Sequence, residues 1–243
     1  MKPAESIALV TGANKGLGRE ISRQLAARGV NVLLGARDPE RGRRAEAECQ
    51  GEGLAVRFVQ LDVTDQQSVD RAAAWIAREH GRLDILVNNA GIALDWVPPS
   101  ACDQASFEKT YETNVFGVFR VTKAMLPLLR TSKAARIVNV SSGLGSLSQT
   151  ADPNGPFRDR NILLAYCSSK SALNMMTLHF ARELKAAGIK VNAANPGYTA
   201  TDMNQHQGVK TVAQGAATPV RLALLADDGP TGGCFADEGP APW

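Results

Sequence analysis

A tyrosine and a lysine lie four residues apart in the stretch AYCSSKSALN, residues 165–174. The spacing of the apolar residues predicts a helix from about 164 to 187, which places Tyr166 and Lys170 one turn apart on the same face. A phenol has a pKa of about 10 and exchanges protons poorly at neutral pH. Because a nearby ammonium group lowers the pKa of a phenol, the pair has a physical route to general acid–base chemistry. Taken alone, a pair at this spacing also arises by chance.

A glycine-rich stretch near the N-terminus could hold a phosphate group. The sequence TGANKGLG at 11–18 ends a short apolar run at 6–12 and opens a helix-spaced segment at 16–29. Glycines allow a tight turn and a close approach of the backbone to a ligand, and the N-terminus of a helix offers free N–H groups to an anion. The spacing is wider than the common dinucleotide fingerprint, but its place after the first predicted strand favours nucleotide binding.

The end of the second predicted strand indicates which nucleotide is bound. An NAD site usually has an acidic residue there, which holds the ribose 2′-hydroxyl group. Asp38 lies near that position, but its place directly before Pro39 makes it a helix cap. The strand itself ends in GAR, so that Arg37 can bind a 2′-phosphate, with Lys15 of the glycine loop as a second positive charge. This pattern favours NADP(H) over NAD(H); the alternative is that both basic residues belong to a solvated surface.

Apolar runs and helix-spaced segments alternate along the whole chain. Strands are expected at 6–12, 30–36, 54–63, 84–91, 136–142, 189–197 and 233–236, and helices at 16–29, from Asp38, from Thr64 or Asp65 to about 80, at 103–131, 164–187 and 211–226. This alternation predicts an α/β fold of the Rossmann type, a doubly wound parallel sheet of about seven strands with helices on both faces, in three layers. We expect residues 1–243 to form a single dinucleotide-binding and catalytic domain.

The composition excludes several classes of protein. Hydrophobic residues make up 44% and charged residues 21% of the chain, with a net charge of +3, which is typical of a globular protein without a nucleic-acid partner. The four cysteines are widely spaced, which indicates reduced thiols and a cytoplasmic location, and the three histidines are too isolated to form a metal site. No signal-peptide profile and no apolar run of membrane-spanning length occur, so no membrane partner is expected.

Six short motifs occur in a fixed order along the chain. They are TGANKGLG at 11–18, NNAG at 88–91, ETNVFG around Asn114, NVSSG at 139–143, YCSSK at 166–170 and NPG at 195–197. As a set, they resemble the short-chain dehydrogenase/reductase family in its single-domain branch, and the chain is similar to the NADPH-dependent carbonyl reductases of that family. The resemblance covers nearly the whole sequence.

The resemblance implies a catalytic tetrad of Asn114, Ser142, Tyr166 and Lys170. In such enzymes the tyrosine donates a proton to the carbonyl oxygen of the substrate, and the serine hydrogen-bonds to the same oxygen. The lysine lowers the pKa of the tyrosine and holds the ribose of the cofactor. The asparagine interrupts its helix and positions a water molecule that leads to the lysine. Ser141 is the alternative for the serine.

The resemblance also implies which residues contact the NADP(H) cofactor. The glycine loop would hold the diphosphate, the residues after the third strand would meet the adenine, the NNAG motif would line the ribose, and the NPG motif would lie against the nicotinamide. The full set is Gly12, Asn14, Lys15, Gly16, Leu17, Gly18, Arg37, Asp62, Val63, Asn89, Ala90, Gly91, Tyr166, Lys170, Pro196, Gly197 and Thr199.

The segment between the catalytic serine and tyrosine departs from the pattern of many family members because it is longer. Residues 143–163 are rich in Ser, Pro, Asn and Gly and lack periodicity, which is typical of a functional loop. Monomeric carbonyl reductases carry a longer insert at this place, which could shield the helix that other members use for tetramer contacts. A monomer is therefore favoured over a homo-oligomer.

The expected walls of the substrate pocket are mostly apolar. They are the stretch from Ile92 to Trp96, the insert from Leu144 to Phe157, and Tyr198. The polar segment after Met203 is short for a lid, which indicates an open pocket. A small hydrophobic ketone or aldehyde fits such walls better than a charged metabolite. The C-terminal sequence TGGCFADEGPAPW departs from the ending of many members and leaves the last strand open.

Two other functions are compatible with parts of this pattern. A catalytically silent protein that senses NADP(H) would share the fold but usually lacks the tyrosine or the lysine. Sugar-nucleotide epimerases share the Tyr–Lys spacing, but they have a different glycine spacing and a substantial C-terminal substrate domain. The sequence favours an NADPH-dependent carbonyl reductase over both.

Overall fold

The protein is described by a computed structural model, in which residues 5–159 and 161–243 are placed. Within these residues the strands form one eight-stranded sheet in the order β3-β2-β1-β4-β5-β6-β7-β8. Neighbouring strands are parallel except for the last pair, which is antiparallel. The strands are β1 (Ile7–Val10), β2 (Asn31–Ala36), β3 (Val56–Gln60), β4 (Ile85–Asn88), β5 (Arg136–Val140), β6 (Lys190–Ala194), β7 (Cys234–Ala236) and β8 (Gly239–Ala241).

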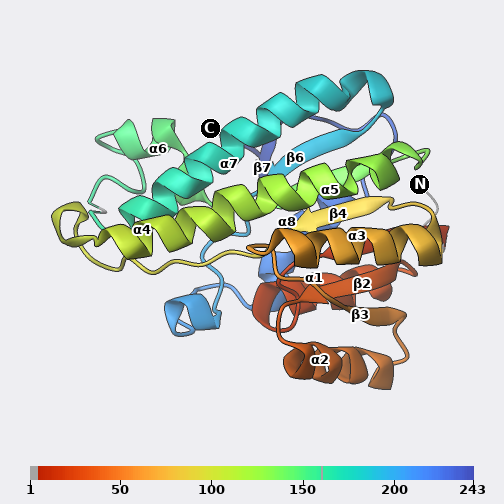
Figure 1. Ribbon diagram of the computed structural model, residues 1–243. Coiled ribbons are helices and arrows are strands. Elements are labelled where there is room, and N and C mark those ends of the chain that lie inside the picture. Colours follow the sequence, from red (N-terminus) through yellow and green to blue (C-terminus); the bar gives the residue numbers. More distant parts are fainter. Residues whose placement is uncertain (1–4, 160) are drawn as a thin grey trace.

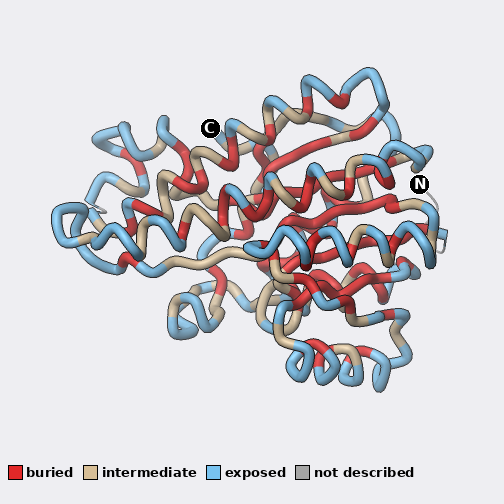
Figure 2. The backbone as a smooth tube through the Cα atoms, in the orientation of Figure 1, coloured by how far each residue is buried: buried red, intermediate tan, exposed pale blue. Residues whose placement is uncertain are grey.

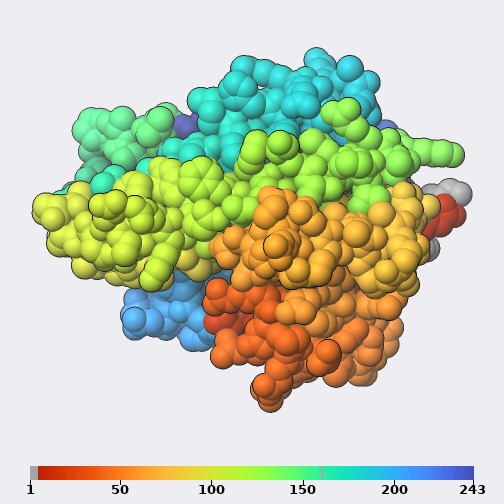
Figure 3. Space-filling view, viewed as in Figure 1, coloured from red at the N-terminus to blue at the C-terminus, as the bar shows by residue number. Residues whose placement is uncertain are grey.

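Helices cover both faces of this sheet, so the predicted three-layer α/β fold is confirmed (Figure 1). The α-helices are α1 (Gly16–Ala26), α2 (Pro39–Gly51), α3 (Gln66–His80), α4 (Gln104–Tyr111), α5 (Val118–Arg130), α6 (Leu147–Ala151), α7 (Leu164–Leu184) and α8 (Val212–Ala223). Shorter helical turns are η2 (Pro99–Ala101), η3 (Glu112–Gly117), η4 (Gly143–Gly145), η5 (Lys185–Ala187) and η6 (Asp202–Asn204). Side chains of α3, α5 and α7 cover the near face in the space-filling view (Figure 3).

Two hydrophobic cores lie on opposite sides of the sheet. In β1, Ala8 and Val10 belong to the core under α1, α2 and α8, whereas Ile7 and Leu9 belong to the core under α3, α5 and α7. This division follows from the two-residue period of a strand, and it explains why the central strands read as continuous apolar runs. Figure 2 shows the buried strands between helices whose outer faces are exposed.

The structure differs from the sequence-based expectations at three places. The expected long helix at 103–131 contains a π-helical turn, η3, between α4 and α5. The expected irregular segment at 143–163 contains η4 and the short helix α6, and residue 160 lies outside the described residues. An eighth strand, β8, consists of Gly-Pro-Ala, a composition that is depleted in strands and therefore gave no strand signal.

The caps of two helices match the sequence-based interpretation. The Asp38 side chain accepts hydrogen bonds from the N–H groups of Glu40 and Arg41 at 3.0 and 3.1 Å. Asp65 caps α3 in the same way through the N–H of Gln67. Asp38 is thus engaged by its own helix, and this supports its interpretation as a cap rather than as a ribose ligand.

Candidate active site

The predicted site residues follow the carboxyl ends of the strands, which point to the left in Figure 1. The strand order changes direction between β1 and β4, and parallel α/β sheets bind ligands at such a point. Segments after β1, β4, β5 and β6 meet there, together with the start of α7.

The glycine loop after β1 is shaped by two close backbone approaches. Gly12 has a φ of 61°, and a Cβ atom built on it would lie 2.8 Å from the Cα atom of Ala90. A Cβ atom on Gly18 would lie 2.4 Å from Nδ2 of Asn89. The Asn89 amide holds the loop by donating to the carbonyl groups of Thr11 and Gly12 at 2.9 and 3.2 Å. These two positions therefore require glycine, because the loop packs directly against Asn89 and Ala90.

Helix α1 offers its N-terminal N–H groups at this loop. Lys15 occupies the N-cap position in an extended conformation, and its side chain does not cap the helix. Gly16 follows with a φ of 53°, and Asn14 and Leu17 beside it are half-buried. A helix N-terminus without a side-chain cap is a favourable place for a phosphate group. The loop therefore fits the diphosphate of a dinucleotide.

The two basic residues expected at the 2′-phosphate differ in their contacts. Nζ of Lys15 lies 2.6 Å from Oδ2 of Asp202 in η6, and both side chains are more than half exposed. Asp202 also contacts Nε2 of His206 at 3.0 Å. Arg37 directly follows β2, is exposed, and forms no salt bridge within residues 5–159 and 161–243. No local pattern could point to Asp202 as a partner of Lys15, because Asp202 comes 187 residues later in the chain.

The two residues after β3, Asp62 and Val63, are less accessible to an adenine ring than expected. Oδ1 of Asp62 accepts hydrogen bonds from the backbone N–H and the hydroxyl group of Thr64 at 2.9 and 2.7 Å. Val63 is 8% exposed and packs against Gly117, where an added Cβ atom would lie 2.9 Å from Cγ2 of Val63. The contact of Asp62 and Val63 with adenine stays a prediction.

The structure separates the two adjacent serines that follow β5. The hydroxyl group of Ser141 is buried and donates to Oδ1 of Asn174 at 2.6 Å. Ser142 accepts from the N–H of Leu144 at 3.2 Å, and its hydroxyl group lies close enough to the Tyr166 phenol to lower the pKa of that phenol. Only Ser142 is therefore placed beside the proton donor that the sequence predicts.

Burial changes the acid–base properties of the Tyr166–Lys170 pair. The loss of solvation raises the pKa of the Tyr166 phenol to about 12, against a smaller lowering by its hydrogen bond with Ser142. Burial also lowers the pKa of the Lys170 amine to about 8. The amine donates to the carbonyl group of Val140 at 2.9 Å and lies 5.5 Å from the centroid of the Tyr166 ring. Desolvation of the phenolate dominates the pKa of Tyr166, and the lowering of this pKa by the lysine stays a prediction.

Asn114 lies within the π-helical turn and is completely buried. Its Oδ1 accepts from the N–H of Ile92 at 2.9 Å, and its Nδ2 donates to the carbonyl group of Ile92 and to Oγ of Ser169 at 2.9 and 3.0 Å. Gly91 completes this corner, since a Cβ atom on it would lie 3.5 Å from Nζ of Lys170. The expected helix interruption is present, and π-bulges occur frequently at functional sites.

The NPG motif forms a tight turn after β6. Gly197 has a φ of 72°, and the Thr199 hydroxyl group donates to the carbonyl group of Pro196 at 3.2 Å. Lys210 also donates to that carbonyl group at 3.3 Å. Thr199 is only 6% exposed, so the turn presents its backbone rather than this hydroxyl group.

Comparisons with known proteins agree with this geometry. The family model for short chain dehydrogenases matches residues 6–211. Carbonyl reductase [NADPH] 3 of Mus musculus is 38% identical, and the (+)-neomenthol dehydrogenase of Arabidopsis thaliana is 35% identical; each match covers 94% of both chains. A short-chain dehydrogenase of Shigella flexneri, solved in complex with NADP, is 28% identical, with a TM-score of 0.82 over 96% of this chain and 97% of that one.

The chain belongs to the short-chain dehydrogenase family. It is accordingly an oxidoreductase enzyme, similar to carbonyl reductases.

Several of the residues expected to line the substrate pocket of this short-chain dehydrogenase expose apolar side chains. Trp96 and Tyr198 are 43% and 45% exposed, and Leu147 of α6 is 71% exposed. Phe157 lies beside Gly143, where an added Cβ atom would be 3.1 Å from Cζ of the ring. The expected wall residues thus include several apolar groups that are available to a ligand.

The insert is fixed to the far end of the chain. The carbonyl oxygen of Trp243 accepts hydrogen bonds from the hydroxyl groups of Ser146 and Ser148 at 2.9 and 2.6 Å, and from the N–H of Ser148 at 3.2 Å. The segment after β8 therefore helps to hold α6 beside the site. The monomeric state that was expected from the insert stays a prediction.

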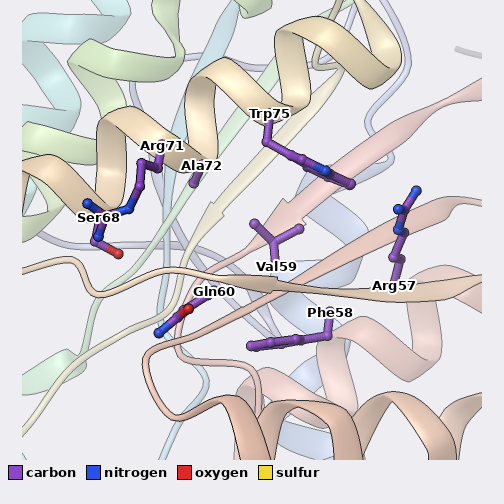
Figure 4. A pocket seen from close by; sticks show the side chains of 8 residues that line it. All are labelled: Arg57, Phe58, Val59, Gln60, Ser68, Arg71, Ala72 and Trp75. Atoms are coloured by element: carbon purple, nitrogen blue, oxygen red, sulfur yellow. The ribbon is translucent and has the colours of Figure 1, made fainter.

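A separate cavity of about 290 Å³ lies beside the edge strand β3, between β3 and α3 (Figure 4). The Arg57 guanidinium group stacks over the Trp75 ring at 4.6 Å. Glu46 of α2 accepts a hydrogen bond from the N–H of Phe58, which covers part of this edge strand. β3 is separated from β5 by three strands, so this cavity is not part of the candidate active site.

Among the described residues, no group of three or more His, Cys, Asp or Glu side chains could hold a metal ion. No helix within the same ranges is long and apolar enough to cross a membrane.

Proposed function

We propose that the protein is an NADPH-dependent reductase that converts a hydrophobic ketone or aldehyde into the alcohol. The observation that carries the proposal is the placement of the Ser142 hydroxyl group beside the Tyr166 phenol, one helical turn from the buried amine of Lys170. Two neighbouring hydroxyl groups can both hydrogen-bond to a single carbonyl oxygen. The family of the chain and the name of its mouse relative, carbonyl reductase, support the same reaction class.

The residues present fit NADP(H) as the cofactor. The glycine loop and the N-terminus of α1 suit its diphosphate, and the exposed Arg37 suits its 2′-phosphate. Asp38, the acidic residue nearest the end of β2, is engaged as a helix cap. When bound, the cofactor supplies the hydride for the reduction. The names of the mouse and bacterial relatives, which include NADPH and NADP, support this choice.

Tyr166 is well suited to donate a proton during reduction. Because its pKa is raised to about 12, the phenol stays protonated throughout the physiological pH range. Ser142 would hold the carbonyl oxygen against the phenol so that the proton moves over one short hydrogen bond. General acid catalysis by a positioned side chain contributes roughly 10²- to 10⁴-fold to the rate. Lys170, whose amine is charged below about pH 8, would hold the hydroxyl groups of the cofactor ribose.

The exposed apolar groups among the expected wall residues support a hydrophobic substrate. Trp96, Leu147 and Tyr198 come from three different segments and expose large apolar surfaces. Burying such surface against an apolar ligand contributes about 25 cal/mol per Å². A charged metabolite would lose its hydration there without gaining an opposite charge from these side chains.

The test is an assay of NADPH oxidation with a panel of ketones and aldehydes, run in parallel with NADH. We expect turnover with NADPH, and we expect Tyr166→Phe to lose at least 10²-fold in kcat because the proton donor is removed. Tyr111→Phe is the matched control, since the Tyr111 ring stacks on Phe107 in α4 and lies outside the tetrad.

Two results would contradict the proposal. Full turnover by Tyr166→Phe would rule out the tyrosine as the proton donor. Tight binding of NADPH without turnover of any carbonyl compound would instead favour a catalytically silent sensor of NADP(H).

A further inference from the structure

The helix that carries Tyr166 begins without a cap of its own. Leu163 occupies the N-cap position of α7 with a φ of 66° and cannot cap the helix with its apolar side chain. A left-handed conformation is uncommon for leucine and persists only where surrounding contacts hold it. The first N–H groups of α7 must therefore find partners elsewhere in the chain.

Asp95, which comes 70 residues before the helix, supplies these partners. Its Oδ2 accepts from the N–H of Ala165 at 2.6 Å, and its Oδ1 accepts from the N–H of Tyr166 at 3.4 Å. The backbone carbonyl group of Asp95 accepts from the N–H of Leu163 at 3.0 Å. One residue thus binds both the strained residue and the backbone of the proton donor.

This cap is shielded from water. Asp95 is 1% exposed, and Leu163 and Ala165 are 2% and 0% exposed. Asp95 forms no salt bridge within residues 5–159 and 161–243, so its carboxylate is balanced by N–H groups and by the positive end of the helix dipole. Burying a carboxylate is costly unless hydrogen bonds compensate it, and here those bonds are made to the start of the catalytic helix.

The other side of the Tyr166 backbone is fixed as well. The Ser169 hydroxyl group donates to the carbonyl group of Tyr166 at 2.7 Å, and Asn114 donates to Oγ of Ser169 at 3.0 Å. Asn114 also holds Ile92, which starts the segment that leads to Asp95. A closed network therefore surrounds the peptide groups of Tyr166.

We propose that Asp95 is a positioning residue for the proton donor: its buried carboxylate caps α7 and sets the location of the Tyr166 phenol relative to Ser142. The inference rests on the proposed function. Asp95 does not touch the reacting atoms, and it acts through the backbone of Tyr166. Displacing a catalytic group by about 1 Å can cost on the order of 10²-fold in rate, so the loss of this cap reduces kcat rather than cofactor binding.

The experiment compares Asp95→Asn and Asp95→Ala with the wild type. Asparagine keeps one acceptor oxygen, whereas alanine removes both. We expect kcat to fall about 10-fold for Asp95→Asn and about 100-fold for Asp95→Ala, with the Kd of NADPH, measured by fluorescence, changing less than about threefold. The matched control is Asp65→Ala, which removes the cap of α3 and should leave kcat unchanged. If neither Asp95 variant loses more kcat than the control, the proposal is overturned.

A measurement on the wild-type protein does not depend on the stability of the variants. Amides in the first turn of an ordinary exposed helix exchange readily, but the proposal requires the amides of Ala165 and Tyr166 to be protected on the order of 10²-fold or more. Rapid exchange of both amides would overturn the inference. If the wild type turns over no carbonyl compound, the proposed function fails, and hydrogen exchange still decides whether Asp95 fixes the backbone of Tyr166.

Discussion

Lys15 and Lys170 are both expected to act on one cofactor, but their surroundings are opposite. Lys15 has a side chain that is 57% exposed, and its ammonium group is paired with an exposed carboxylate. Lys170 is 4% exposed, and its amine is fixed on the carbonyl group of Val140. The glycine-loop region thus carries exposed charged side chains that can exchange partners. The α7 region instead fixes the position of its reacting groups by burial.

The energies of the two regions differ accordingly. An exposed pair such as Lys15–Asp202 contributes about 0–1 kcal/mol and is screened by salt. Burial shifts the pKa of Lys170 from 10.5 to about 8, which corresponds to a free-energy difference on the order of 3 kcal/mol between its charged and neutral forms. Changes in the α7 region are therefore expected to have larger effects than changes in the glycine-loop region.

Among the variants that test the contrast between the glycine-loop region and the α7 region, Lys170→Met is expected to have the largest effect. Methionine fills the buried space without a charge, so we expect kcat/KM to fall about 10²- to 10³-fold. Because burial lowers the pKa of Lys170 to about 8, the amine is charged below that pH and loses its charge as the pH rises through it. Wild-type kcat/KM for reduction should therefore fall above about pH 8, while Tyr166 stays protonated.

The control for this prediction is Lys123→Met. Lys123 lies over the Phe119 ring on α5. The Lys123→Met variant should therefore retain both the activity and the pH profile of the wild type. A falling limb near pH 8 that persists in Lys170→Met would assign that titration to another group. Such a result would remove the evidence that the buried Lys170 differs from the exposed Lys15 in its effect on the reaction.

The sequence predicted those features that depend on neighbouring residues. Parallel strands are buried on both faces, so their apolar runs were visible, and the cap at Asp38 was visible from the proline that follows it. The pairing of Tyr166 with Lys170 needed only the helical period. β8 could not be predicted, because a strand of Gly, Pro and Ala forms only through its pairing with β7.

The remaining features of the site depend on contacts between distant segments. Asp95 lies 70 residues from the helix it caps, and no local pattern marks it as different from a polar loop residue. Asp202 is likewise separated from Lys15 by 187 residues. The direction of the pKa shift of Tyr166 also required the fold, since the spacing of two residues carries no information about how far the phenol is buried.

A smaller effect is expected for Arg37→Ala, which tests charge recognition at the glycine-loop region. Removing an exposed guanidinium group from the 2′-phosphate should raise the Kd of NADPH about 10-fold and leave the Kd of NADH nearly unchanged. Arg43→Ala, which removes an exposed arginine from the following helix, is the matched control. Equal losses of affinity for both cofactors would contradict a role at the 2′-phosphate. Fluorescence titration with each cofactor measures the difference.

The smallest effect is expected for Asp202→Asn, which removes the partner of Lys15 without changing the size of the side chain. If Lys15 exchanges the Asp202 carboxylate for a phosphate group, this variant should bind NADPH about two- to fivefold more tightly at low salt, and the gain should shrink as salt screens the charges. The same substitution in a Lys15→Met background separates this exchange from a general effect of one fewer negative charge. An equal gain in NADPH affinity in the wild-type and the Lys15→Met backgrounds would show that Asp202 acts on the cofactor directly. Lys15 would then keep a single partner, as the buried Lys170 does.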